Sequence, residues 1–348
     1  MAHRFLAACR RKPVDRVPVW MMRQAGRYQP SYRAVREKVG FLELCRSAEL
    51  VAEVTAAPIV EFGFDAAILF SDILIHLPAM GLDLSFERGE KGRGDGGPRI
   101  ANPVGSRAGV DALRVPDPER DLPFVRESIG ATRRALGGRV PLIGFVGGPF
   151  TVGSYVVEGG SPGFGRLKAF LWSDPATAGA LFEKLTRAAV VQIEAQVAAG
   201  VEAVQVFESW LGELSREDLQ AFSFPYLARI AEAIRRSGVP GILFSTGTAA
   251  HLEQLATLGF DVLSVDWRIP IGEARARVPG VALQGNLDSA LLLGPADHAA
   301  ARAVALVRAA GPEPGYIFNL GHGVPVGTPP ETVRAVVGAV QALRWDQG

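Results

Sequence analysis

Cysteine is scarce in this chain, whose 348 residues contain only Cys9 and Cys45, both outside any recognisable motif. Two such thiols form no disulfide framework, so we expect the protein in a reducing cytoplasm. Charge of one sign is lacking too, because 37 Lys and Arg residues stand against 36 Asp and Glu residues. A net charge of +1 gives no general attraction to nucleic acid or to a membrane surface, so any recognition of anions has to be local.

Long apolar runs are also missing. No run reaches the roughly 18 residues of a membrane-spanning helix, and the apolar part of the N-terminus, MAHRFLAACRRK, is too short for a secretory signal. None of the other four histidines has metal-ligand spacing to His322, and no G-x-G-x-x-G follows the first predicted strand. We therefore expect no metal, flavin or nucleotide cofactor.

Short β-branched runs alternate with segments of helical period along the chain. The candidate strands are Val17–Met22, Ala66–Phe70, Leu142–Val146, Ala203–Phe207, Gly241–Phe244, Val262–Val265, Val281–Leu283 and Tyr316–Asn319. The amphipathic segments between them include Ala176–Ala199, Arg216–Ser237, Ala249–Leu258 and Glu331–Leu343. This alternation predicts one α/β domain over residues 1–348, a (β/α)8 TIM barrel with an N-terminal extension. The alternative is an open doubly wound sheet, which the missing glycine-rich loop disfavours.

Polar residues follow most of the predicted strands at their carboxyl ends, which converge on one mouth in a barrel. They are Arg23, Ser71, Asp72, Glu208, Ser209, Ser245, Thr246, Asp266, Asn286 and His322, with Gly147-Gly148-Pro149 after the third strand. Because Ser, Asp and Asn often close turns or cap helices, we expect about half of these residues to do only that. Of two glycine-rich segments, we interpret Arg88–Pro98 as a mobile excursion and Glu158–Gly165 as a lid or rim.

Two arginines mark the segment VPVWMMRQAGRYQPSY, residues 17–32. The apolar run at its start delivers Arg23 and Arg27 to the strand exit. Arginine is suited to bidentate recognition of carboxylate or phosphate in a partly dry pocket. An isolated R-x-x-x-R is more often a solvated basic turn, but here Gly26 lets the backbone bend, and Gln24 and Tyr28 are polar without charge. The segment therefore predicts an anion-binding site.

Four further residues are candidates for the same site. Asp72 in AILFSDIL has apolar neighbours on both sides, so it is either a helix N-cap or a carboxylate aimed into the barrel mouth. Tyr155 lies one to two turns beyond a strand exit, where a tyrosine is more often part of the core. Ser209 can equally be a cap, and His322 stands between two glycines after the last strand.

Several segments, taken in order, resemble the uroporphyrinogen decarboxylases, the haem-pathway enzymes that remove four acetate carboxyls from a tetrapyrrole. VWMMRQAGRY, ILFSDIL, GPF…EGG and LGHG are similar to signatures of that family, and VFES is similar to its FES or FDS element. The resemblance extends from Phe5 to the LGHG…P region, and Pro329-Pro330-Glu331 opens the last helix as in the family. Three places depart from the family pattern and leave details of the rim open: Ser245–Ala250, Arg268 and Ser289.

The resemblance implies a cofactor-free homodimer that converts uroporphyrinogen III into coproporphyrinogen III and CO2. A pyrrole protonated on carbon is itself an electron sink, so an acetate arm can lose CO2 without a cofactor. By resemblance, Arg23 and Arg27 hold carboxylates, and Asp72 accepts hydrogen bonds from pyrrole N–H groups. Tyr155 reaches the reacting acetate, while Ser209 and His322 contact substrate side chains.

On this basis Asp72, Arg23 and Tyr155 are the candidate catalytic residues. Among possible proton donors, Tyr155, His322 and an arginine-bound water all remain open.

Two other classes of protein are alternatives. Related zinc-dependent corrinoid and thiol methyltransferases share this barrel, but they need a His/Cys zinc cluster. No H-x-C lies at the exit of the fifth strand or at the end of the eighth. A non-enzymatic barrel that binds tetrapyrroles or other polyanions would keep the arginines without needing Asp72.

Overall fold

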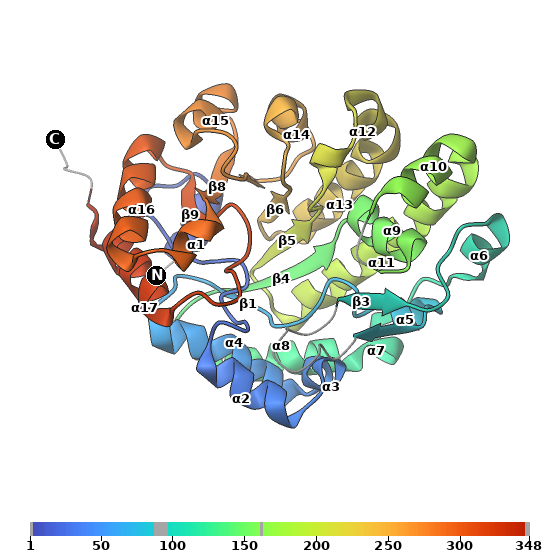
Figure 1. Ribbon diagram of the computed structural model, residues 1–348, viewed down its shortest axis with the longest axis horizontal. Coiled ribbons are helices and arrows are strands. Elements are labelled where there is room, and N and C mark those ends of the chain that lie inside the picture. Colours follow the sequence, from blue (N-terminus) through green and yellow to red (C-terminus); the bar gives the residue numbers. More distant parts are fainter. Residues whose placement is uncertain (1–2, 87–96, 161–162, 345–348) are drawn as a thin grey trace.

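The structure, a computed structural model, describes residues 3–86, 97–160 and 163–344. At its centre lies a curled sheet of seven strands, with helices around it (Figure 1). Each strand pairs in parallel with the next in the sheet, so all the carboxyl ends lie at one edge. In order, the strands are β1 (Ala67–Ile68), β4 (Leu142–Gly147), β5 (Ala203–Phe207), β6 (Gly241–Phe244), β7 (Val262–Ser264), β8 (Ala282–Leu287) and β9 (Tyr316–Leu320).

The strands are apolar runs because the sheet is buried on both faces. Every residue of β6, β7, β8 and β9 is buried. One cluster of buried side chains takes a residue from almost every strand, including Ile143, Ala203 and Ile242. Helix α1 (Arg4–Cys9) adds Phe5 to this cluster, where its ring meets the ring of Trp20 edge-on with 6.4 Å between centroids.

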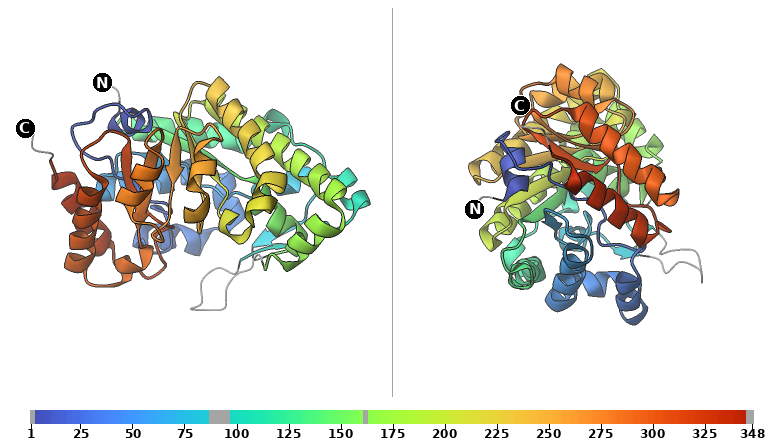
Figure 2. Two further views of the ribbon diagram at one scale, coloured as in Figure 1. Left: turned by 90° about the horizontal axis from the view of Figure 1, so that it is seen from above. Right: turned by 90° about the vertical axis from the view of Figure 1, so that its left-hand side faces the viewer.

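The helices fall into two groups. Those that pack against the sheet or against one another between strands are α4 (Ala48–Phe62), α8 (Pro123–Leu136), α11 (Pro175–Ala199), α13 (Phe224–Arg236), α14 (Leu252–Ala256), α15 (Ile271–Arg277), α16 (Ala296–Ala310) and α17 (Pro330–Ala342). Shorter elements occupy the connections: α2 (Pro30–Lys38), α3 (Phe41–Arg46), α5 (Leu77–Met80), α6 (Arg107–Ala112), α7 (Pro118–Asp121), α9 (Pro149–Glu158), α10 (Gly165–Ser173), α12 (Arg216–Phe222), η1 (Leu211–Glu213), η2 (Ala249–His251) and η3 (Ser289–Leu293). Figure 2 shows α16 and α17 packed side by side.

The predicted helices agree with the structure where local signals are strong. Helix α11 begins where the Asp174 carboxylate accepts the N–H of Thr177, and it ends at Gly200, whose φ is 108°. The segment predicted as one helix at Arg216–Ser237 is instead two helices, α12 and α13. Pro225 lies in the first turn of α13, where its missing N–H costs nothing, and the same residue would interrupt a continuous helix.

The prediction of a strand at Val17–Met22 is wrong. This segment makes one isolated parallel bridge, Val19 to Phe318 of β9, and the N–H of Asp65 donates to the Val19 carbonyl at 2.8 Å on its other side. Pro18 has no N–H to donate. Several other backbone N–H groups of the segment donate to side-chain oxygens and not to the carbonyls of a neighbouring strand. The N–H of Val19 donates to Asp65, that of Met21 to Gln24 and that of Met22 to Asn319.

A short antiparallel hairpin was missed in the sequence. Strand β2 (Leu84–Phe86) pairs with β3 (Pro98–Ile100), so that Phe86 lies opposite Pro98. The excursion predicted at Arg88–Pro98 lies almost entirely outside the described residues. The strands that flank it were not anticipated because each is only three residues long.

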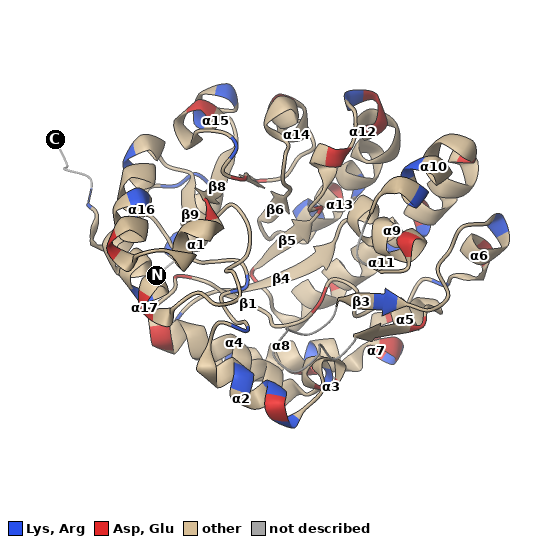
Figure 3. Ribbon diagram, viewed as in Figure 1, with Lys and Arg blue, Asp and Glu red and all other residues tan. Residues whose placement is uncertain are grey.

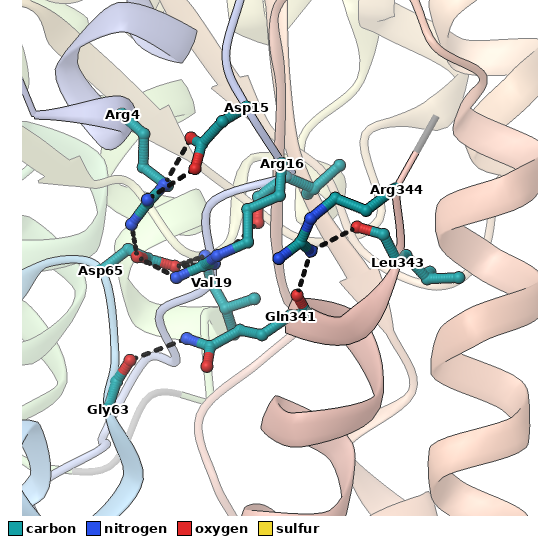
Figure 4. Close-up of polar contacts among 10 residues, drawn as sticks. Arg4, Asp15, Arg16, Val19, Gly63, Asp65, Gln341, Leu343 and Arg344 are labelled. Atoms are coloured by element: carbon teal, nitrogen blue, oxygen red, sulfur yellow. Dashed lines mark hydrogen bonds and ion pairs between the residues drawn. The ribbon is translucent and has the colours of Figure 1, made fainter. Parts of the chain in front are cut away.

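A buried ion-pair cluster joins the N-terminal segment to the start of β1 (Figure 4). The Asp65 carboxylate accepts hydrogen bonds from Arg4 at 2.7 Å, from both terminal nitrogens of Arg16 at 2.7 and 2.8 Å, and from the N–H of Val19 at 2.9 Å. Nearby, Gln341 of α17 donates to the carbonyl of Gly63 at 2.7 Å. The cluster lies at the end of the sheet opposite the strand exits. There it fixes the start of the segment that runs toward Arg23.

Charged residues of both signs are interspersed on the outer helices and loops, while the central strands are almost free of them (Figure 3). No helix in the described part of the chain combines the length and apolar character needed to cross a membrane.

Candidate active site

A cavity of about 430 Å³ lies at the carboxyl ends of the strands. Its volume falls within the range of roughly 300–1,000 Å³ that is typical of small-molecule sites. Its walls come from residues 22–32, from the segments after β1, β5 and β9, from residues of β4 and β6, from α9 and from the β2–β3 hairpin. All six residues that the sequence nominated line this one cavity: Arg23, Arg27, Asp72, Tyr155, Ser209 and His322.

The two arginines give the cavity its positive charge. Neither the Arg23 nor the Arg27 guanidinium has a hydrogen-bond or ion-pair partner among the described residues. Asp72 is the only carboxylate among the described residues of the lining, so with a neutral His322 the two arginines leave a formal charge of +1 there (2 − 1). Unpaired guanidiniums at the wall of a partly apolar cavity are suited to holding carboxylates.

A dense set of hydrogen bonds braces the loop that carries these arginines. The buried Gln24 side chain accepts the N–H of Met21 at 3.3 Å and donates to the carbonyl of Ala66 at 3.1 Å. The Tyr28 hydroxyl donates to the Gln24 carbonyl at 2.7 Å. Arg33 of α2 donates to the carbonyls of Arg27 and Tyr28 at 2.9 and 2.8 Å. The backbone that carries the two arginines is therefore held in place before any ligand binds.

Asp72 combines the two roles that the sequence left open. Its Oδ1 accepts the N–H of Leu74 at 2.8 Å, which closes a local turn, and its carboxylate also faces the cavity. Burial raises the pKa of Asp72 to about 6, while the Leu74 N–H and the positive charge of Arg23 act in the opposite direction. Arg23 and Asp72 are thus close enough to interact electrostatically.

Tyr155 and His322 are both half-buried and electrically neutral near pH 7. Burial, together with the negative charge of Asp72, raises the pKa of Tyr155 to about 12. Burial and the positive charge of Arg23 lower the pKa of His322 from its usual value. Ser209 lies two residues after the end of β5 and also lines the cavity.

Of the other strand-exit residues, Ser71 also lines the cavity, whereas most of the rest hold loops. Buried Glu208 accepts the N–H groups of Phe150 and Thr151 at 2.9 and 2.7 Å, which caps α9, the helix that carries Tyr155; burial raises its pKa to about 7. Asp266 accepts the N–H of Gly247 at 2.8 Å and is paired with Arg268. Ser245, Thr246 and Asn286 likewise bond to backbone groups of neighbouring loops.

Aromatic rings form much of the remaining wall, and sequence reasoning missed them. The sequence did carry a signal, because β5 and β6 both end in phenylalanine at the edge where the cavity opens. Trp210 and Phe86 also line the cavity, Phe86 from the unanticipated hairpin. The aromatic residues of the lining are Tyr28, Tyr32, Phe41, Phe70, Phe86, Phe145, Tyr155, Phe207, Trp210 and Phe244.

No group of three or more His, Cys, Asp or Glu side chains within residues 3–86, 97–160 and 163–344 is arranged to hold a metal ion. Cys9 and Cys45 are both buried and unpaired.

The fold and the cavity together define a TIM-barrel-like α/β protein whose cavity, in its described lining, carries two arginines, one aspartate and many aromatic rings. A methyltransferase from Methanosarcina mazei has a similar fold, with a TM-score of 0.79 and 25% identity over 97% of each chain. A B12-independent methionine synthase from Shewanella sp. W3-18-1 matches more distantly, with a TM-score of 0.58 and 12% identity over 94% of this chain and 96% of that one, which shows the fold alone.

Sequence comparison narrows the class. The family model described as "Uroporphyrinogen decarboxylase (URO-D)" matches residues 1–343. The uroporphyrinogen decarboxylase of Anaeromyxobacter dehalogenans is 76% identical over 99% of this chain and 100% of that protein. That of Myxococcus xanthus is 46% identical over 98% of this chain and 96% of that protein. The chain belongs to the uroporphyrinogen decarboxylase family, which confirms the resemblance seen in the sequence.

Proposed function

We propose that this chain is a carboxy-lyase that removes the four acetate carboxyls of uroporphyrinogen III stepwise, giving coproporphyrinogen III and CO2 in porphyrin and haem biosynthesis. Family membership supports the reaction. The observation that carries the proposal is the placement of Asp72 in one cavity with two arginines, of which Arg23 acts on it electrostatically and neither has an ion-pair partner among the described residues. Such a site offers cations to the substrate's carboxylates and one anion to its pyrrole N–H groups.

Each nominated residue receives a role in this proposal. Arg23 and Arg27 hold substrate carboxylates, and Asp72 accepts the pyrrole N–H groups and stabilises the ring when it becomes cationic. Tyr155 reaches the acetate that reacts. Ser209 and His322 contact the remaining substrate side chains. Asp72, Arg23 and Tyr155 are the catalytic residues.

The chemistry requires no group beyond the substrate and these side chains. Protonation of a pyrrole carbon makes the ring an electron sink, and the electron pair of the breaking C–C bond flows into it as CO2 leaves. The exocyclic methylene group that results takes up a proton and becomes a methyl group, and the ring carbon releases the proton it had gained, so each cycle consumes one proton. Apolar aromatic walls strengthen the interaction of Asp72 with the cationic ring, because they screen charges less than water does.

Anaerobic incubation with uroporphyrinogen III, followed by oxidation and chromatography, tests the proposal. The protein, stripped with a chelator, should yield porphyrins with seven, six, five and finally four carboxyls. Unchanged substrate in the presence of bound tetrapyrrole would favour a non-enzymatic binding protein. Activity that returned only when zinc was added would favour metal chemistry.

The proposal also fixes the pH dependence. Since the pKa of Asp72 lies at about 6, kcat/KM should fall about tenfold per pH unit below that value, as the catalytic carboxylate becomes protonated. His322 also titrates in acid, so the profile should be measured for His322→Gln as well. The acid limb should persist in that variant. Its disappearance there would assign the limb to His322 instead.

We further propose that residues 1–348 form one domain with a closed (β/α)8-like barrel. In it, residues 17–22 take the eighth position, between β9 and β1, without forming a regular strand, and the preceding residues are an N-terminal extension. The Val19 bridge and the bond from Asp65 support this closure.

The unpaired cysteines support a reducing cytoplasm as location. A homodimer is proposed from family resemblance and because symmetric dimers are the commonest oligomers; light scattering that reported a monomer at micromolar concentration would contradict it.

A further inference from the structure

Gly323, which follows His322 in the loop after β9, lies against Arg23. Two hydrogen bonds fix the neighbouring backbones to each other. The N–H of Val324 donates to the Met22 carbonyl at 2.9 Å, and the N–H of Met22 donates to the Asn319 side chain at 3.0 Å. The residues on either side of this contact are therefore held in register, and neither backbone is free to retreat.

The Arg23 side chain runs through the space that a side chain at position 323 would occupy. A Cβ added to Gly323 would lie 2.4 Å from Cδ of Arg23, 2.7 Å from its Cγ and 3.0 Å from its Nε. Carbon atoms in favourable contact are about 3.5–4.0 Å apart. An alanine methyl at position 323 and the present path of Arg23 are mutually exclusive.

The backbone of Arg23 cannot absorb this clash. Its φ is 61°, a left-handed conformation that is unusual for any residue other than glycine. The next residue, Gln24, is 1% exposed and bonded on both sides, to Met21 and Ala66. Gly323 itself does not have a positive φ, so its own backbone accepts an alanine. A glycine is therefore needed at position 323 because of the adjacent Arg23 side chain. In a Gly323→Ala variant, that side chain would have to move.

We propose that Gly323 is a positioning residue: by lacking a side chain, it leaves a path for the stem of Arg23 and so sets where the guanidinium stands in the cavity. This inference rests on the proposed function, in which that guanidinium holds a substrate carboxylate. Displacement of a positioning group by about 1 Å can cost on the order of a hundredfold in rate. Gly323→Ala should therefore lower kcat/KM on that order while the melting temperature stays close to that of the wild type.

A double-mutant cycle with Arg23→Ala separates this role from a general structural one. In the Arg23→Ala background the clashing atoms are absent, so adding Gly323→Ala should change kcat/KM by no more than about twofold. Gly338→Ala is the matched control, because an added Cβ there meets nothing within 4 Å, and it should leave activity unchanged. If Arg23→Ala turns over too slowly, the same cycle is measured by the binding of uroporphyrin III, followed by protein fluorescence.

Additive effects of the two substitutions, or wild-type activity of Gly323→Ala, would overturn the inference. A crystal structure of Gly323→Ala provides a readout that does not depend on activity, and it should show the Arg23 side chain on a different path. If the wild type neither decarboxylated nor bound the tetrapyrrole, the proposed function would fail. An unmoved Arg23 in that crystal structure would refute the positioning role whatever the reaction is.

Discussion

Replacing Asp72 by asparagine should lower kcat about a hundred- to a thousand-fold, equivalent to about 2.7–4 kcal/mol of transition-state stabilisation, while the protein stays folded. The amide oxygen can still accept the Leu74 N–H, so the turn survives, but the charge that favours the cationic ring is lost. Steady-state decarboxylation rates and thermal melting of the variant provide the measurement. A folded Asp72→Asn enzyme with a near-wild-type rate would show that this residue only closes its turn.

Two companion variants sharpen this result. Asp72→Glu should also be slow, because the extra methylene displaces the carboxylate within a cavity whose walls are already fixed. Arg27→Ala should chiefly raise KM, because binding of a carboxylate that does not react contributes about equally to the ground state and the transition state. The contrast between the variants at positions 72 and 27 separates charge stabilisation from substrate binding.

Removing the carboxylate of Asp65 should have the largest effect on stability, lowering the free energy of unfolding by about 3–5 kcal/mol. The Asp65 and Arg16 side chains are only 5% and 12% exposed, so Asp65→Ala leaves a nearly buried guanidinium without its partner and the Val19 N–H without its acceptor. Denaturant unfolding followed by circular dichroism measures the change.

Asp15→Ala is the matched control for this prediction. Asp15 also pairs with Arg4, but its side chain is 63% exposed, so its loss should cost no more than about 1 kcal/mol. Equal destabilisation by the two substitutions would mean that the buried cluster contributes no more than a surface ion pair.

The positions of most strands could be predicted, because a strand that is buried on both faces consists mainly of consecutive apolar residues. The segment at Val17–Met22 carries the same signal, yet it is not a strand. Its N–H groups are taken by Asp65, Gln24 and Asn319, and two of these residues are distant in the sequence. Side-chain acceptors of this kind become visible only once the fold has brought them together. The division between α12 and α13, by contrast, could have been predicted, because Pro225 is visible in the sequence and a proline interrupts a helix.

The grouping of Asp72, Ser209 and His322 follows from a general rule, since parallel strands place their exits at one edge. Arg23 and Arg27 follow a segment that is not a strand, and Tyr155 lies on α9, so the rule alone does not place them. The catalytic and binding roles of all six residues stay predictions. The division between cavity residues and loop-holding residues could not be predicted, because Glu208 and Ser209 are neighbours in the sequence and differ only in what stands opposite them. The same holds for Gly323, whose proposed role depends on the path of an arginine 300 residues earlier.

The left-handed backbone of Arg23 has a consequence for engineering this protein. That conformation costs a non-glycine residue roughly 1–2 kcal/mol. A redesign that scored folding alone would therefore choose Arg23→Gly and gain thermal resistance at this position. It would also discard one of the two cations that the cavity offers to a ligand. Thermal stability and the proposed binding of the substrate therefore make opposite demands on this residue. Stabilising substitutions have to be made elsewhere in the chain.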